Sequence, residues 1–237
     1  MTWFRSYLAD RTRTFVAGED HHGPLPVSCS VPQGSVLGPI KFIAYTEDVS
    51  ELIAQHGVSY HLFADDKQLY TAVSSDEIQV ARQRLTSCIS VLRDWCASRR
   101  LQLNASKTEL IWFGTRTSLR RLSYADRTLT IDSMDVQPSD VVRDLGVLLD
   151  SELTLKHHVN RIASTCFYHL RRLRQLKRHV GVEVMKQLIS SFIFSRLDYC
   201  NALLIGLPFS TIAPLQRVPP PHVYFRNCRG VTTYAQP

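Results

Sequence analysis

Two adjacent carboxylates, Asp65 and Asp66, are the residues of this sequence best suited to metal-dependent chemistry. They lie in FADDKQLY (63–70), behind a short apolar run and before a second run of strand-forming residues. This pattern predicts two strands joined by a tight acidic turn. Mg²⁺ binds carboxylates together with substrate phosphates, and two such ions can promote phosphoryl transfer. Aspartates are also common in solvated β-turns, so the pair alone leaves both interpretations open.

A second group of side chains could bind a polyanion. Residues 151–237 hold 12 Lys and Arg against 3 Asp and Glu, whereas residues 1–150 hold 16 against 18. No acidic residue lies between Glu152 and Glu183. The cations there fall mostly off the apolar stripe of a predicted helix, which suits phosphate-backbone binding without sequence preference. A solvated helix and a membrane-surface helix are the alternatives. The cations are Lys156, Arg161, Arg171, Arg172, Arg174, Lys177 and Arg178.

The first quarter of the chain reads as short elements separated by breakers. The sequence predicts a helix over Thr2–Ala9, a strand over Thr12–Ala17, a hairpin loop over Gly18–Pro26 and a returning strand over Val27–Val31. The next block, VPQGSVLGP (31–39), has two prolines and two glycines, which exclude the interior of a helix or of a central strand. A helical stretch with apolar residues between Ile40 and Ile53 is expected to follow, ending at Gly57.

The rest of the chain has two helical parts with strands between them. Ser74 followed by Glu77 is a capping-box pattern, and apolar residues then recur at helical spacing from Ile78 to Cys96. Leu101–Gly114 and Arg127–Asp150 read as short strands and turns. From about 152 two apolar helical stripes follow, Ile162–Leu173 and Met185–Ile193. The order predicts an α+β body with an all-helical basic end, and a boundary near 151.

Composition limits the class of protein. With 237 residues, 44% hydrophobic and 21% charged, the chain is expected to fold. It has no long uninterrupted apolar run and no signal-peptide pattern, so we expect a nuclear or cytoplasmic protein that is neither secreted nor membrane-spanning. The six cysteines form no CxxC motif and are expected to be reduced, mostly buried thiols. The spacing of His157, His158, Cys166 and His169 fits no common zinc site.

Several blocks, taken together and in order, resemble the reverse transcriptase of LINE-type (non-LTR) retrotransposons, especially Jockey-like and related lineages. VPQGSVLGP resembles motif B of that family, FADD resembles motif C, and LNASKTELIWF (103–113) resembles motif D. VRDLGVLLDSEL (142–153) resembles the segment leading into the thumb, and FYHLRRLRQL (167–176) a thumb helix. The resemblance covers about residues 3–218. It implies a partial polymerase palm of antiparallel strands with helices over 1–150 and a helical thumb over 151–218, followed by a Pro-rich tail (219–237) that we expect to be disordered.

The resemblance also implies roles for single residues around the acidic turn. Asp65 matches the main metal ligand of motif C, with Asp66 supporting the charge of a site for Mg²⁺ or Mn²⁺. Lys107 matches a motif-D lysine proposed to protonate the leaving pyrophosphate, although an exposed lysine near a turn would look the same. The implied reaction adds deoxynucleotides to a DNA primer on an RNA template.

Further residues would bind nucleotide and nucleic acid if the resemblance holds. Gln33 and Gly34 match motif-B residues that lie against the incoming nucleotide and the template base, where a glycine lets the backbone approach closely. Ala64 suits a crowded site but could equally be ordinary strand packing. The basic helix would be the part of the thumb that grips template and primer, through Arg171, Arg172, Arg174, Lys177 and Arg178. The sequence gives no indication of oligomeric state.

Two features depart from the family pattern. The polymerase needs a third carboxylate from motif A, and no AFD-type block precedes Gln33; Asp10 and Asp20 lie in the wrong context. Lys67 stands where relatives usually carry threonine, which puts a cation beside the predicted metal site. We therefore expect a truncated reverse transcriptase domain that is inactive alone. The alternatives are a non-catalytic nucleic-acid-binding remnant and a decayed reading frame without a selected role.

Primer extension tests this expectation directly. The 237-residue chain, incubated with an RNA template, a DNA primer, deoxynucleotides and Mg²⁺, should give no product above background, because one ligand of a two-metal site is not supplied. Extension by the wild-type chain that disappears in Asp65→Ala would contradict the expectation and would establish activity of these residues alone.

Overall fold

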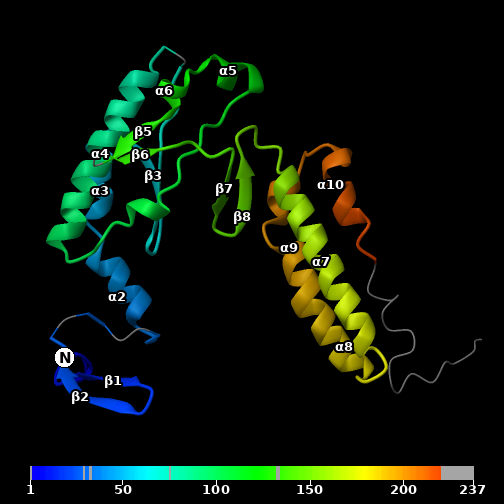
Figure 1. The fold of residues 1–237 in the computed structure, drawn as a ribbon, viewed down its shortest axis with the longest axis horizontal. Helices are drawn as coiled ribbons and strands as arrows, with labels where there is room; N and C mark the ends of the chain where they lie inside the picture. The colour runs from blue at the N-terminus through cyan, green and yellow to red at the C-terminus, as the bar shows by residue number, and fades with distance from the viewer. Residues whose placement is uncertain (1, 29, 32–33, 75, 132–133, 220–237) are drawn as a thin grey trace, which may run out of the picture. The chain divides into compact units, whose positions relative to one another are not determined.

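The computed structural model describes residues 2–28, 30–31, 34–74, 76–131 and 134–219. These residues form two compact units, the first made of residues 1–73 and 80–103 and the second of residues 74–79 and 104 onward. Helices alternate with four two-stranded antiparallel sheets in the described part of the chain, which is compatible with the predicted α+β class (Figure 1). The chain enters the second unit for the last time at residue 104. The division into palm and thumb at 151 stays a prediction.

The first unit begins with helix α1 (Thr2–Leu8) and a hairpin of β1 (Thr12–Ala17) and β2 (Asp20–Pro26). The helix and the first strand confirm the prediction. The second strand was misplaced, because it starts at Asp20 and no strand covers the described residues of 27–31. Gly18 has a φ of +65°, which permits a tight turn right after β1, and proline is tolerated in a strand that lies at an edge.

Two short helices replace the single helical stretch expected after the glycine-rich block. Helix α2 (Gly38–Tyr45) and helix α3 (Val49–Ala54) are separated by a turn in which the Thr46 hydroxyl donates to the carbonyl of Phe42 at 3.0 Å. Only α3 contributes to the core: Val49 and Ile53 are buried, whereas Ile40 and Ile43 of α2 are 65% and 60% exposed. The apolar pattern therefore predicted the helices but not their burial.

The core of the first unit lies between α3, the hairpin of β3 (Ser59–Phe63) and β4 (Asp66–Tyr70), and the long helix α4 (Ile78–Ser98). The predicted apolar stripe of α4 is buried or half-buried as expected. The capping box is formed in part: the Glu77 carboxylate accepts from the Ser74 hydroxyl at 2.8 Å and from its backbone N–H at 3.4 Å. The buried residues of this core are Val49, Ile53, Val58, Cys88, Leu92 and Cys96.

The second unit opens with short elements. The 3₁₀ turn η1 (Ala105–Lys107) precedes helices α5 (Arg116–Arg121) and α6 (Tyr124–Arg127), whose N-caps are the hydroxyls of Thr115 and Ser123. Two hairpins follow, β5 (Leu129–Ile131) with β6 (Met134–Val136), and β7 (Val141–Asp144) with β8 (Val147–Asp150). The short strands and turns between 127 and 150 agree with the prediction. Residues 101–114 contain η1 and an isolated bridge from Leu110 to Pro138 but no strand, so the prediction of strands there was wrong.

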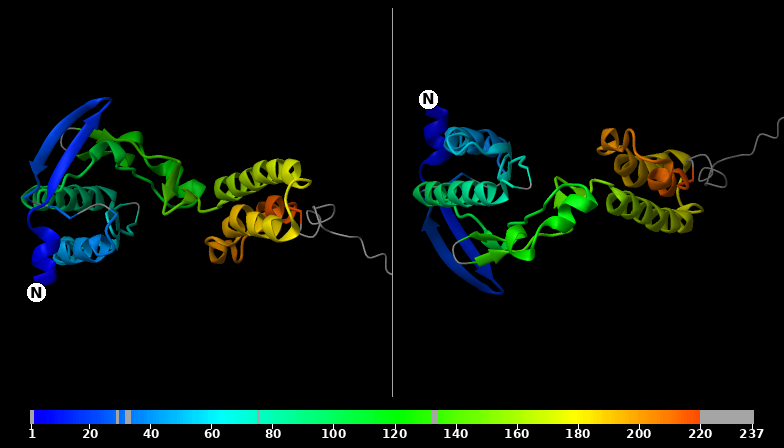
Figure 2. Two further views of the ribbon diagram at one scale, coloured as in Figure 1. Left: turned by 90° about the horizontal axis from the view of Figure 1, so that it is seen from below. Right: turned by 90° about the horizontal axis from the view of Figure 1, so that it is seen from above.

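The helical end is built on α7 (Lys156–Leu176), which runs antiparallel to α8 (Val182–Ile189) (Figures 1 and 2). A π-helical turn η2 (Ser190–Phe194) and helix α9 (Ser195–Asp198) extend α8, and η3 (Asn201–Leu204) and α10 (Phe209–Gln216) follow. Both predicted stripes meet in one core, whose buried members are Cys166, Leu170, Leu173, Met185, Ile189 and Ile193. No helix in the described part of the chain is both long and apolar enough to cross a membrane.

Tyr199, which follows α9, holds the β7–β8 hairpin against this helical part. The Tyr199 hydroxyl donates to the carbonyl of Leu145 in the β7–β8 turn. The next residue, Gly146, has a φ of +90°, and a Cβ there would lie 3.3 Å from the Tyr199 ring. An L-residue at 146 would thus be strained by its backbone and would press against the ring.

The junction between β8 and α7 is held by a buried carboxylate. Asp150 accepts hydrogen bonds from the backbone N–H of Thr154 at 2.9 Å and of Leu155 at 2.7 Å, and so holds the two residues that lead into α7. Burial by itself would raise the pKa of Asp150, but these hydrogen bonds outweigh it and leave the pKa below its ordinary value. Nearby, the buried His158 accepts from the Leu148 backbone N–H at 3.3 Å, and burial lowers its pKa.

Replacement of Asp150 by Asn should destabilise the chain by about 1–3 kcal/mol near neutral pH, because one charged acceptor of buried N–H groups is lost. A carboxyl with a lowered folded-state pKa stabilises above its ordinary pKa, and this stabilisation is lost as pH falls through the folded-state value. The difference between wild type and Asp150→Asn in urea unfolding should therefore shrink in acid. Glu152→Gln, an exposed neighbour, is the control. Equal effects of both variants would contradict the role of Asp150 in holding the β8–α7 junction.

Candidate functional site

The predicted acidic hairpin is present in the first unit. Strands β3 and β4 pair antiparallel with Phe63 opposite Asp66, so that Ala64 and Asp65 form a two-residue turn. Asp65 lies in the turn and Asp66 is the first residue of β4, and both side chains are exposed. This confirms the predicted pair of strands joined by a tight acidic turn, although the turn is Ala64–Asp65 and Asp66 already belongs to β4. The two carboxylates sit on adjacent residues at the end of the hairpin and are open to solvent.

Ala64 adopts a backbone conformation that is unusual for a residue with a side chain. Its φ is +55°, in the left-handed region, and its side chain is exposed in the turn rather than packed within a strand. A positive φ at the first position of a two-residue turn matches the twist of the flanking strands. The conformation costs alanine about 1–2 kcal/mol relative to the right-handed region. The turn that carries Asp65 is therefore held against local backbone preference by the pairing of β3 with β4.

Lys67 lies beside the acidic turn but on the other face of the hairpin. Residues directly opposite in a ladder share a face, so Lys67 lies with its partner Leu62, and Asp66 with Phe63. The Lys67 ammonium donates to the backbone carbonyl of Asp65 at 3.3 Å. It also lies 5.9 Å from the centre of the Phe42 ring of α2. Lys67 thus stabilises the turn by donating to a main-chain carbonyl of the turn. Its contact with the Phe42 ring also links α2 to the turn end of the hairpin.

The face that carries Asp66 is aromatic and exposed. Phe63 and Tyr70 are exposed, and the Tyr70 ring stacks on His61 with ring centres 5.3 Å apart. The Tyr70 hydroxyl and the Nε2 of His61 lie 3.2 Å apart, within hydrogen-bonding distance. This surface places flat side chains on the same face of the hairpin as the Asp66 carboxylate.

The motif-B residues are described only in part. Gln33 lies outside the described residues. Gly34 is exposed, has a φ of +80° and has nothing within 4 Å of the position of a Cβ. The glycine is thus required by the backbone conformation, since an L-residue rarely adopts it. Gly34 precedes α2, the helix whose Phe42 lies near Lys67.

Lys107 is exposed at the end of η1 and belongs to the second unit, whereas the acidic hairpin belongs to the first. Its predicted role beside the acidic turn therefore stays a prediction. The same holds for the roles given to Gln33, Gly34 and Ala64.

The donor set of the turn fits a hard divalent cation. Two exposed carboxylates offer oxygen ligands, and Mg²⁺ is commonly held by one or two carboxylates with water and substrate phosphates completing its shell. Within the described part of the chain, no three His, Cys, Asp or Glu side chains are grouped closely enough to hold a metal ion by themselves. Asp65 and Asp66 could therefore hold Mg²⁺ or Mn²⁺ only together with further oxygen ligands.

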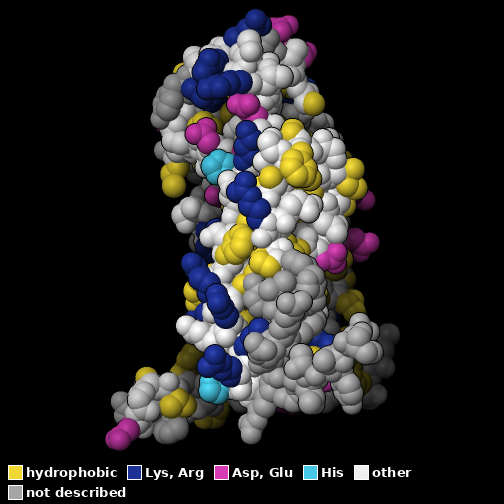
Figure 3. Space-filling model, turned by 90° about the vertical axis from the view of Figure 1, so that its right-hand side faces the viewer, with side chains coloured by type: hydrophobic (Ala, Val, Ile, Leu, Met, Phe, Trp, Pro, Cys, Tyr) yellow, Lys and Arg dark blue, Asp and Glu magenta, His cyan; other side chains and the backbone are white. Residues whose placement is uncertain are grey.

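The predicted cationic helix is α7 and the turn after it. Arg171, Arg172, Arg174 and Arg178 are exposed, and Lys177 is half-buried. Lysine and arginine side chains recur down one side of the molecular face drawn in Figure 3. The buried stripe of α7 contains Val159, Ala163, Cys166, Leu170 and Leu173. Arg161 and Arg172 lie across the helix from this stripe, whereas Arg174 borders it.

Aromatic side chains lie among these cations. Tyr168 and Phe167 are 47% and 37% exposed. Arg172 donates from Nη1 to the Tyr168 hydroxyl at 2.9 Å, and its guanidinium carbon lies 5.8 Å from the centre of the ring. The sequence analysis counted the cations but missed the two aromatics. Their helical spacing, which puts them off the buried stripe, was a signal that could have identified them.

Burial and two nearby arginines lower the pKa of a neighbouring histidine, His169. His169 stacks on Phe192 with ring centres 5.0 Å apart. Partial burial lowers its pKa, and the positive charges of Arg196 and Arg172 lower it further. Both burial and the neighbouring arginines therefore disfavour the charged form of His169.

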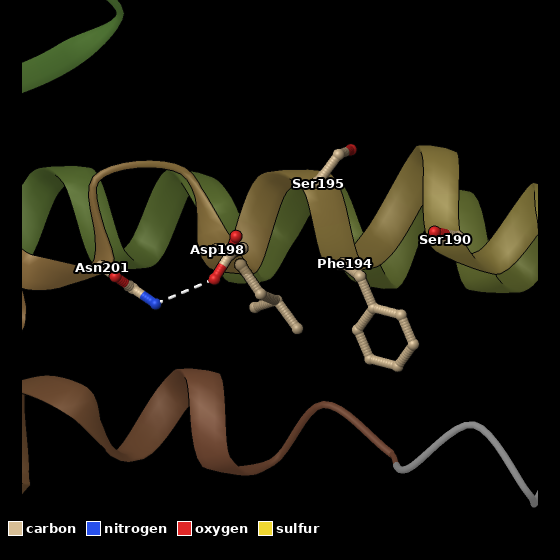
Figure 4. A pocket seen from close by; sticks show the side chains of 6 residues that line it. Ser190, Phe194, Ser195, Asp198 and Asn201 are labelled. Carbon is tan, nitrogen blue, oxygen red and sulfur yellow. Dashed lines mark hydrogen bonds between the residues drawn. The ribbon is translucent and has the colours of Figure 1, made fainter.

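An open pocket of about 540 Å³ lies beside η2 and α9. Figure 4 shows its polar side, where the Asn201 amide donates to Asp198 at 3.0 Å, and the Phe194 ring nearby. The pocket is lined by Ser190, Phe194, Ser195, Leu197, Asp198 and Asn201, none of which the sequence analysis selected.

Comparison with known proteins identifies the first two thirds of the chain. Residues 1–149 match the family model described as reverse transcriptase (RNA-dependent DNA polymerase). No solved structure matches the chain significantly.

Curated relatives come from mobile elements of Drosophila melanogaster. The probable RNA-directed DNA polymerase from transposon BS is 26% identical over 181 residues, which cover 73% of this chain and 19% of the relative. The RNA-directed DNA polymerase from mobile element jockey is 25% identical over 164 residues, 67% of this chain and 17% of the relative. The probable RNA-directed DNA polymerase from transposon X-element is 29% identical over 143 residues, which cover 57% of this chain and 14% of the relative. The chain thus matches between 14% and 19% of the length of these relatives.

Proposed function

The chain belongs to the reverse transcriptase (RNA-dependent DNA polymerase) family, and we propose that it forms part of the RNA-directed DNA polymerase of a LINE-type retrotransposon. The observation that carries the proposal is the pair Asp65–Asp66 at the turn of the β3–β4 hairpin, within the residues that match the family. The named relatives, all polymerases of mobile elements, support the LINE-type assignment. The partners would be an RNA template, a DNA primer and deoxynucleotides.

The acidic turn would act as the divalent-metal site of the polymerase. Asp65 and Asp66 would hold Mg²⁺ or Mn²⁺ through their exposed carboxylates, with substrate phosphate oxygens as further ligands. The bound ion would stabilise negative charge on the transferred phosphoryl group. Lys67 would keep the turn in place through its hydrogen bond to the Asp65 carbonyl. Lys107 would protonate the leaving pyrophosphate, and Gln33, Gly34 and Ala64 would border the incoming nucleotide and the template base.

The cationic side of α7 would hold template and primer as the thumb of the enzyme. Exposed arginines on a helix whose opposite side is packed in a core can follow a phosphate backbone without reading sequence. The charge distribution supports this proposal, because no acidic residue interrupts the stretch from Glu152 to Glu183. A nucleic-acid-binding segment without catalytic activity is the second candidate, and this surface favours it equally.

Mn²⁺ titration followed by NMR tests the metal site without requiring activity. Paramagnetic Mn²⁺ should broaden the backbone amide signals of residues 63–67 of the wild-type chain at the lowest concentrations. Asp65→Ala and Asp66→Ala should each weaken this binding at least tenfold, since each removes a ligand of a site with few protein ligands. Glu51→Ala, which removes an exposed carboxylate from α3, is the matched control. Unchanged broadening in both aspartate variants would refute the metal site.

Binding of a primer–template duplex at several salt concentrations tests the thumb assignment. Replacement of Arg171, Arg172 and Arg174 by Ala should weaken binding at low salt and reduce the slope of log K against log salt by up to about 3, because up to three phosphate contacts are lost. The matched control replaces Arg116, Arg120 and Arg121, three exposed arginines of α5, by Ala. No binding at low salt, or equal slopes for both triple variants, would reject the assignment.

A further inference from the structure

Two exposed aromatic side chains interrupt the cationic side of α7. Tyr168 lies across the helix from the buried Cys166 and Leu173, so packing against the core does not explain it. Phe167 lies on the neighbouring flank and is less exposed. Flat side chains among arginines, on a helix whose sequence contains no acidic residue, differ from the purely charged surface that phosphate binding alone requires.

Resting on the proposed function, we infer that Tyr168 is a stacking site for an unpaired base, so that α7 binds single-stranded nucleic acid in addition to duplex backbone. Bases within a duplex are already stacked on their neighbours, and their faces are closed to a side chain at the surface. A single strand presents free base faces, and any base can stack on an aromatic ring. Tyr168 therefore adds binding only for an unpaired strand.

The spacing along α7 allows one strand to contact the ring and two cations together. Arg161, Tyr168 and Arg172 lie seven and four residues apart, which puts them on one flank of the helix. With a rise of about 1.5 Å per residue, Arg161 lies about 10 Å before the ring and Arg172 about 6 Å after it. Both arginines are exposed, so the phosphates on either side of a stacked base have a partner.

Arg172 also orients the ring. Its guanidinium donates to the Tyr168 hydroxyl at 2.9 Å and lies 5.8 Å from the ring centre. The residue as a whole is 47% exposed. The hydroxyl hydrogen bond limits rotation of the side chain, while the exposed surface is free for a base. The ring itself is the binding group, and the hydroxyl positions it.

The test compares single-stranded RNA with an RNA–DNA duplex of equal phosphate count, by fluorescence anisotropy on the full chain at several salt concentrations. Tyr168→Ala should weaken single-strand binding about fivefold or more and leave duplex binding unchanged within twofold. The salt slope should not change, since no charge is removed. Tyr168→Phe keeps the ring and should bind the single strand nearly as wild type does.

The outcomes separate this inference from the thumb assignment. Phe209→Ala, an equally large change at an exposed aromatic of α10, is the control and should have no effect. Equal losses for single strand and duplex in Tyr168→Ala, or no loss for either, would overturn the stacking site, while the arginine variants could still weaken binding. If neither nucleic acid binds the wild-type chain, both proposals fail. Thermal unfolding of each variant checks that the fold is retained.

Discussion

The packing of α4 and α3 against one face of the β3–β4 hairpin is the constraint on which the candidate site depends. Tyr60, Leu62 and Leu69 turn toward that core, and strand alternation then sends Asp66 to the opposite, exposed face. A slip of one residue in the pairing would exchange the faces and bury the carboxylate. Core packing thus selects the register, and the register selects which carboxylate lies in the turn.

Elements with a long periodic pattern were predicted well from the sequence. The stripes of α4 and α7 contain enough apolar residues at helical spacing that no other arrangement buries them, and the structure has both helices with these faces inside. The acidic turn was predicted because two strand-like runs flank it closely. The hydroxyl caps at Thr115 and Ser123, by contrast, were not anticipated, because a lone Thr or Ser is too common to mark a helix start.

Short elements depended on information that local pattern does not contain. Strand β2 includes two prolines, which argue against a strand unless it is known to be an edge. Whether Ile40 and Ile43 are buried depends on whether another part of the chain packs over them, and their local sequence does not contain that information. Contacts such as Lys67 with the Asp65 carbonyl, or Arg172 with Tyr168, depend on where the side chains lie in the folded chain. The amino-acid composition gives only the number of charged residues.

Tyr199 joins residues that are 54 positions apart when it donates to the Leu145 carbonyl and covers Gly146. This contact closes a long loop that contains the whole of α7, α8 and α9. During synthesis from the N-terminus, the β7–β8 turn therefore lacks its contact with the Tyr199 ring until the chain has been synthesised past α9. The β7–β8 pairing itself is local and needs no later residue, so the chain can form the hairpin first and cover its turn only after the helices have been synthesised.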